Sequence, residues 1–326
     1  MGKRLINLGK ERLPLLFLGG VSLASLALIV VFGQTAKRWL PTEQVEPTQQ
    51  QELESTKAFQ LALQPPEARR DMLQQLIEFG SASDAHLARY LLATDLLNQE
   101  QGSEALAVLS NQTVAQHVLT PYVLLRRGQA QQLTGEAPTS WNDLLANYDT
   151  HSAAAEARYE LGKQDPTQWE TLLKKHPSHP RAVEIAQKKL RTGTSKGLLL
   201  LVAAHGLYLE EYEASLDRLT KEYGQELTPE QWETVGFGYW ENLSYGKASE
   251  AYEKAPVSPT NLYRAGRGAQ IARQRVSAIS NYQKLAKTYP NAPETGLGLI
   301  KLADSLPDKA ALAPLDQVIK TFPERA

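Results

Sequence analysis

The sequence predicts an all-α protein in which one N-terminal transmembrane helix is followed by an α-solenoid of antiparallel helix pairs. Three observations support this fold class. An uncharged apolar run occupies residues 13–33. From about residue 56 onward, apolar residues recur at spacings of three and four, broken by proline and glycine, with no series of strand-like alternation. A set of bulky and small residues also recurs thirty residues apart, between 232 and 282.

The composition is that of a folded protein and excludes several classes of function. Of the 326 residues, 42% are hydrophobic and 22% are charged, and the net charge is −1. A chain without an excess of positive charge lacks the electrostatic footprint of a nucleic-acid-binding protein. The absence of cysteine excludes a disulfide framework, a thiol nucleophile and cysteine-ligated zinc.

Residues 13–33 have the length of a membrane-spanning helix. These 21 residues would span roughly 31 Å, about the thickness of the hydrocarbon core. The positive-inside rule places the basic segment 1–12 in the cytoplasm and the chain from about Lys37 onward outside. A cleaved signal peptide is the alternative, but its apolar core normally has about 7–15 residues, so a signal-anchor helix is the favoured interpretation.

The rest of the chain divides into a linker and a solenoid. Residues 34–55 are polar and contain prolines, which predicts a juxtamembrane linker. The solenoid is expected over 56–326 and is most regular over 229–323. Its earlier part predicts helices at 67–79 and 87–97, a partner helix from Ala105, and a helix pair at 122–133 and 141–148.

Two copies of one pattern define the regular part. Each copy has a large apolar residue, a glycine four positions on, a packing residue three further on, then an alanine and an aromatic residue. The positions are Trp232, Gly236, Tyr239, Ala248 and Tyr252, then Leu262, Gly266, Ala269, Ala278 and Tyr282, with Pro290 after a further gap. The pattern resembles the tetratricopeptide repeat (TPR), in which two helices approach closely because small residues lie at their crossing.

A second phrase recurs where the second helix of a pair is expected to end. A ring residue, usually followed by proline, ends the helical pattern at Tyr148, His176, Tyr289 and Phe322. Proline cannot continue a helix, and the ring is expected to close its apolar face.

The candidate site residues are few. His176 and His179 suggest a metal site, but no third ligand has a suitable spacing, so a surface turn between helices is the favoured interpretation. Trp240 follows Tyr239 directly and is expected to point elsewhere, which makes it the candidate for a ligand or partner contact. No phosphate-binding loop, nucleophile elbow or metal motif is present, so we expect no catalytic residue, cofactor or metal.

Further phrases resemble the N-terminal region of membrane-anchored, Slt-type soluble lytic transglycosylases of cyanobacteria. They are spread from about residue 60 to residue 326, at 88–95, 115–126, 176–181 and 291–297. In that family, a long α-superhelix precedes a lysozyme-like domain that cleaves the MurNAc–GlcNAc bond of peptidoglycan with one glutamate. That glutamate belongs to a Glu-Ser phrase with Gly-Leu-Met-Gln and Ala-Tyr-Asn phrases downstream. Glu54-Ser55 has neither phrase after it, so the resemblance implies only the superhelical, wall-facing module.

The expected function is a non-catalytic, membrane-anchored, periplasmic TPR-like scaffold associated with peptidoglycan processing. The helical pattern stops at Pro323 without an evident polar capping helix, so we expect the solenoid to continue in a longer parent protein. One alternative is therefore the N-terminal part of a lytic transglycosylase with its catalytic domain beyond residue 326. A second alternative is a general scaffold for envelope proteins. The expected partners are the membrane, envelope proteins and peptidoglycan, and not nucleic acid.

Overall fold

Helices account for all the regular secondary structure in the part of the chain that the computed structural model describes, residues 54–110 and 118–325. These residues form seventeen α-helices and two short 3₁₀ helices, which confirms the predicted all-α class. The predicted membrane helix at 13–33 and nearly all of the linker lie outside the described residues. None of the described helices is both long enough and apolar enough to cross a bilayer.

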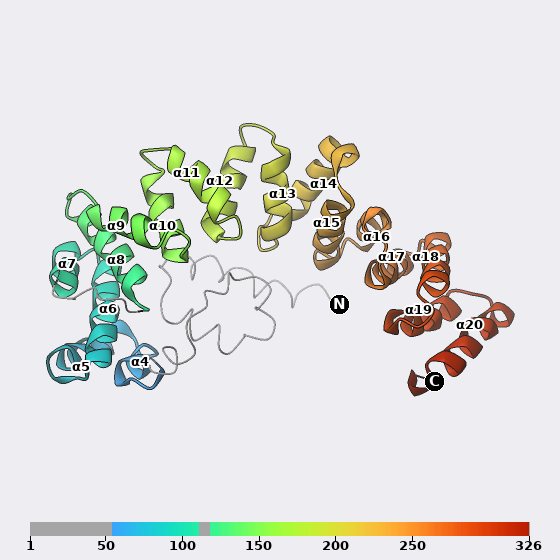
Figure 1. The fold of residues 1–326 in the computed structure, drawn as a ribbon, viewed down its shortest axis with the longest axis horizontal. Helices are drawn as coiled ribbons and strands as arrows, with labels where there is room; N and C mark the ends of the chain where they lie inside the picture. Colours follow the sequence, from blue (N-terminus) through green and yellow to red (C-terminus); the bar gives the residue numbers. More distant parts are fainter. Residues whose placement is uncertain (1–53, 111–117, 326) are drawn as a thin grey trace, which may run out of the picture. The chain divides into compact units, whose positions relative to one another are not determined.

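The described helices belong to two units, 54–182 and 183–325, whose boundary falls within α12. In each unit, a helix packs mainly on its neighbours in the chain, as expected for a helical repeat array (Figure 1). The first unit contains α4 (Lys57–Leu61), α5 (Pro66–Phe79), α6 (Ala82–Asn98), α7 (Gly102–Ser110), α8 (Thr120–Leu133), α9 (Thr139–Asn147), α10 (Ser152–Leu161), α11 (Thr167–Lys175) and the start of α12 (Pro180–Leu190). The second contains α13 (Lys196–His205), α14 (Tyr212–Tyr223), η2 (Gly224–Glu226), α15 (Pro229–Glu241), α16 (Tyr245–Lys254), α17 (Pro259–Ile271), α18 (Arg275–Thr288), α19 (Pro293–Asp304), α20 (Asp308–Thr321) and η3 (Pro323–Arg325).

Alternate helices also touch, which makes each array two layers deep. In the first unit α4 contacts α6, α6 contacts α8, and α8 contacts α10. In the second unit α13 contacts α15, and α17 contacts α19. At these places, helices two apart in the chain lie against one another, and the helix between them packs on both. Such packing joins each pair only to its neighbours, which is the arrangement of a solenoid.

The recurring ring residues begin one repeated turn. Tyr148, His176, Tyr289 and Phe322 are all helix C-caps with φ between −136° and −130° and ψ between 40° and 61°. The backbone N–H of each donates to the carbonyl four residues earlier. At the first three positions, the N–H three residues later donates to the ring residue's own carbonyl, over 3.0–3.1 Å, just before the next helix begins. The repeated phrase thus specifies a short connection between helix pairs.

In the second unit, glycines admit aromatic rings between paired helices. A Cβ added at Gly236 of α15 would lie 3.1 Å from the ring of Tyr252 on α16. One added at Gly266 of α17 would lie 2.6 Å from the ring of Tyr282 on α18. The other bulky and small members of the two copies are buried: Trp232, Tyr239, Ala248, Leu262, Ala269 and Ala278. Pro290 is exposed directly after the Tyr289 cap.

A second glycine, two residues after the first, allows each first helix to approach the pair before it. A Cβ at Gly238 would collide with the hydroxyl of Tyr212 on α14, and one at Gly268 would lie 2.7 Å from the Tyr245 carbonyl on α16. One at Gly298 of α19 would lie 2.9 Å from the Leu285 side chain on α18. The Gly-x-Gly phrase of α15 and α17 therefore occurs a third time in α19, as Gly296-Leu-Gly298.

The first unit uses tryptophan at comparable crossings. A Cβ at Gly128 of α8 would overlap the indole of Trp141, and one at Gly162 would overlap the indole of Trp169. Each indole N–H donates to the carbonyl three residues before its glycine, at 3.0 Å for Leu125 and 2.9 Å for Tyr159. The hydrogen bond fixes the ring at the site that the glycine leaves open.

We predict that Gly266→Ala destabilises the protein and that Gly197→Ala does not. Alanine favours a helix over glycine by up to about 1 kcal/mol, but overpacking against the Tyr282 ring should cost about 1–3 kcal/mol. Gly197 of α13 is the matched control, because the nearest atom to its added Cβ is 3.9 Å away. The urea unfolding midpoint should fall for Gly266→Ala and stay level or rise for Gly197→Ala. Equal midpoints for the two variants would contradict the tight crossing.

Candidate functional site

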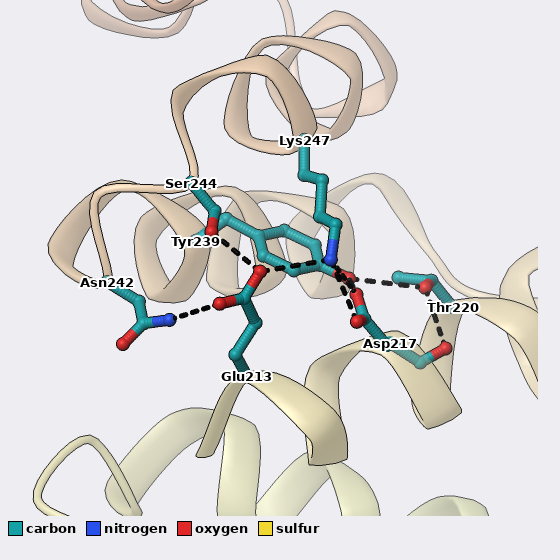
Figure 2. Close-up of polar contacts among 7 residues, drawn as sticks. All are labelled: Glu213, Asp217, Thr220, Tyr239, Asn242, Ser244 and Lys247. Atoms are coloured by element: carbon teal, nitrogen blue, oxygen red, sulfur yellow. Dashed lines mark hydrogen bonds and ion pairs between the residues drawn. The ribbon is translucent and has the colours of Figure 1, made fainter. Parts of the chain in front are cut away.

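The most connected group of polar side chains in the second unit lies between α14, α15 and α16 (Figure 2). We call it the α14–α16 cluster: Glu213, Asp217, Thr220, Tyr239, Asn242, Ser244 and Lys247. Glu213 and Asp217 are four residues apart on α14, so both carboxylates project from one helix face. Lys247 comes from α16, one repeat after Asp217, and its ammonium lies between the two carboxylates.

Lys247 bridges the two acids directly. Its Nζ lies 2.9 Å from Oε1 of Glu213 and 2.7 and 2.8 Å from the two carboxylate oxygens of Asp217. The ammonium also lies over the Tyr239 ring, 5.4 Å from its centroid. The hydrogen bonds to Asp217 raise the pKa of Lys247, because they favour the charged ammonium.

Neutral donors occupy the other sides of both carboxylates. Ser244 donates to Glu213 Oε1 over 2.6 Å, and Asn242 donates to Oε2 over 2.7 Å. The Tyr239 hydroxyl donates to Asp217 Oδ1 over 2.8 Å. The cluster therefore joins α14, the α15–α16 connection and α16 through groups that all have partners.

The proton affinities in this cluster are unsuited to general acid catalysis. The hydrogen bond from Ser244 and the contact with Lys247 lower the pKa of Glu213, so its carboxyl is ionised at neutral pH. Burial raises the pKa of Tyr239, whose hydroxyl therefore keeps its proton. A glycosidase acid needs a carboxyl with a raised pKa beside a second ionised carboxylate. The α14–α16 cluster instead has the paired charges of a structural contact that joins α14 to the next helix pair.

Trp240, the predicted contact residue, is half-buried and has a partner within the chain. Its ring meets Tyr245 edge-on, with centroids 5.2 Å apart and an interplanar angle of 79°. Trp240 lies on α15, one position after Tyr239, but no hydrogen bond of the α14–α16 cluster reaches it. Trp240 therefore packs on the first residue of α16, across the α15–α16 connection.

A shallow hollow of about 450 Å³ lies nearby, between the end of α14, η2 and Trp232. Its lining includes Tyr223, Gly224 and Lys254. The Lys254 ammonium lies 4.1 Å from the centroid of the Trp232 ring. A sugar stacked on this face of the ring would have to displace the Lys254 ammonium.

The turn at residues 176–180 is less exposed than expected. His176 and His179 are buried, with 8% and 7% of their surface exposed, so the expectation of a surface position is wrong. The Nε2 of His176 lies 2.9 Å from the Asp149 carbonyl, and the Nδ1 of His179 accepts from the N–H of Arg181 over 3.2 Å. Burial lowers the pKa of His176, so the ring is neutral near pH 7. Both imidazoles thus have backbone hydrogen-bond partners. No group of three potential metal ligands occurs within the described ranges.

Asp149 lies beside this turn and belongs to a group of ion pairs. Lys175 and Arg158 both contact its carboxylate, and Lys175 is the larger cause of a lowered pKa. The α14–α16 cluster was not recognised in the sequence. Two features of the sequence could have revealed it: the spacing of four between Glu213 and Asp217, and the lysine thirty residues after Asp217.

Comparison with known proteins adds no relative. No protein-family model and no curated protein sequence matches this chain. The resemblance to lytic transglycosylases therefore remains a prediction from the quoted phrases.

We predict that Glu213→Gln lowers stability near neutral pH and much less in acid. Because its pKa is lowered in the folded state, the Glu213 carboxylate stabilises the fold above its unfolded pKa, and this contribution is lost as the pH falls through the folded value. Both Glu213 and Lys247 are partly exposed, so the loss near pH 7 should be about 0.3–1 kcal/mol.

Urea titrations at about pH 7 and about pH 3 measure this effect. Glu250→Gln, at an exposed position of α16, is the matched control and should change little at either pH. A Glu213→Gln deficit of the same size at both pH values would show that packing, and not charge, stabilises this position.

Proposed function

We propose that this chain is a non-catalytic, membrane-anchored periplasmic scaffold of TPR-like helix pairs associated with peptidoglycan processing. The observation that carries the proposal is the serial packing of helices, repeated through one turn geometry and one kind of glycine crossing. An array of this kind exposes many equivalent helix faces and turns, a form suited to binding extended partners.

The acidic residues favour a scaffold over an enzyme. Among the described carboxyl groups, every resolved pKa shift is downward, as at Asp149, Asp165, Glu213, Glu222 and Glu230. The causes are hydrogen bonds and cations that stabilise the ionised form. Carboxyl groups with lowered pKa values are poor proton donors at neutral pH.

The membrane anchor and the wall association rest on the sequence. The apolar run at 13–33, with basic residues before it, supports an exported solenoid held at the membrane. The resemblance of four phrases to the superhelical region of lytic transglycosylases supports a place beside the cell wall. In this proposal, the helical array positions wall-processing enzymes or glycan near the membrane without cleaving glycan itself.

We predict that the full chain binds wall material or wall enzymes but does not cut glycan. Purified chain in detergent is incubated with intact peptidoglycan, and the soluble fragments are identified by mass spectrometry. No anhydro-muropeptides should form, whereas a lytic transglycosylase added as a positive control should release them.

The same chain, tagged and cross-linked in its native membrane, should capture peptidoglycan or peptidoglycan-processing enzymes. An unrelated single-pass membrane protein with the same tag is the control. Anhydro-products released by the chain alone would contradict the non-catalytic function. Capture no different from the control would contradict the association with the wall.

A further inference from the structure

Two arginines lie one turn apart on the partly exposed face of α17. Arg264 and Arg267 are three positions apart, so their side chains project from the same side of the helix. Arg267 lies between two glycines of which Gly266 faces α18 and Gly268 faces α16, and it points toward neither crossing. Both arginines are half-buried. We call them the α17 arginine pair.

Arg264 is held in place by neutral aromatic groups. Its Nη1 donates to the Tyr252 hydroxyl of α16 over 3.0 Å, and its guanidinium lies 5.9 Å from the centroid of the Phe237 ring of α15. Burial raises the pKa of Tyr252 to about 12, so this hydroxyl keeps its proton and adds no negative charge. The guanidinium therefore has a fixed position but no counter-charge from its hydrogen-bond partner.

Arg267 is fixed by a neutral group as well. Its Nη1 donates to Oε1 of Gln270 over 2.7 Å. Gln270 is oriented by the neighbouring helices, because its amide donates to the Lys301 carbonyl of α19 and the Tyr282 hydroxyl donates to its Oε1, both over 3.3 Å. Both guanidiniums are thus positioned in advance, which lowers the entropic cost of binding a ligand.

The α17 arginine pair has no carboxylate partner in the part of the chain that the structure describes. No carboxylate oxygen of the described residues lies within 4.0 Å of either guanidinium. Four other arginines each contact a carboxylate: Arg69, Arg158, Arg181 and Arg218. A partly buried guanidinium is stabilised by a charged acceptor more than by a neutral one, so the pair is suited to binding an anion.

The surroundings of the pair limit the kind of anion. Glu233 and Glu241 of α15 and Glu294 of α19 lie on the first helices of the neighbouring pairs. These acids would repel a long polyanion, such as a nucleic acid or an anionic lipid surface. Ile271 lies four residues after Arg267, is 40% exposed and continues the same face of α17. The face therefore matches a short segment with two acidic residues and one apolar residue.

We propose that the α17 arginine pair binds an extended acidic segment of a partner protein through two carboxylates at alternate positions. Alternate residues of an extended chain share one face and lie about 6.5 Å apart, close to the spacing of about 5–6 Å between residues one helical turn apart. An arginine can donate two parallel hydrogen bonds to one carboxylate. An apolar residue at the next alternate position would contact Ile271. The inference rests on the proposed scaffold function and specifies the segment that the scaffold recognises.

The test uses a fluorescein-labelled peptide, Gly-Glu-Ser-Glu-Ser-Leu-Gly, into which full chain in detergent is titrated while anisotropy is followed. Arg264→Gln/Arg267→Gln should weaken binding at least about tenfold, because both carboxylates lose their charged donors. Arg273→Gln/Lys287→Gln removes two exposed charges from the α17–α18 connection and from α18. It is the matched control and should bind like the original chain.

Two further comparisons separate the geometry of the pair from its charge. A peptide with glutamine in place of both glutamates should bind the original chain at least about tenfold more weakly. Arg264→Lys/Arg267→Lys keeps both charges but lacks the planar fork of donors, so it should also bind the acidic peptide more weakly than the original chain does. Arg267→Gln alone repeats the first comparison if urea unfolding shows that the double glutamine variant is not folded.

Equal binding by the original chain and the double glutamine variant would overturn the proposal. Displacement of the labelled peptide by soluble muropeptides at lower concentrations than by the unlabelled acidic peptide would overturn it too, because the carboxylates would then belong to the wall and not to a protein. The direct titrations contain no wall material, so their failure is separate from a failure of the wall association.

Discussion

The close contact of glycine with an aromatic ring is the constraint on which the helical array depends. At these crossings, the ring occupies the space that a Cβ on the facing helix would need, so the helices approach this closely because that residue is glycine. The same contact recurs with different rings and on different helices: Gly128 with Trp141, Gly162 with Trp169, Gly236 with Tyr252, and Gly266 with Tyr282. A side chain at any of these glycines would therefore force the paired helices apart or move the ring.

Two other interactions act on top of this packing. The α14–α16 cluster joins successive pairs with a lysine between two carboxylates, at a surface where each ion pair contributes little alone. The capped turns set how far one pair lies from the next. Because each pair packs mainly on its neighbours, these contacts act locally, from one pair to the next.

The sequence predicted the all-α class and the serial packing, because the spacing of apolar residues and the caps are local signals. The third Gly-x-Gly phrase, at Gly296 and Gly298, was missed since Ala292 and Asp308 replace the bulky and small residues of the pattern, and a longer connection shifts α20. The crossings of the first unit have no fixed spacing from glycine to tryptophan, so periodicity cannot reveal them. The burial of His176 depends on a carbonyl twenty-seven residues away, which no local pattern encodes.

A double-mutant cycle at Gly266 and Tyr282 tests the central claim most directly. The free energy of unfolding is measured for the original chain, Gly266→Ala, Tyr282→Leu and the double variant. If the ring is what excludes a Cβ at position 266, Gly266→Ala should cost clearly less in the Tyr282→Leu variant than in the original chain, with a coupling of about 1 kcal/mol or more. Additive effects, within about 0.5 kcal/mol, would show that the glycine and the ring do not constrain each other and would contradict the account.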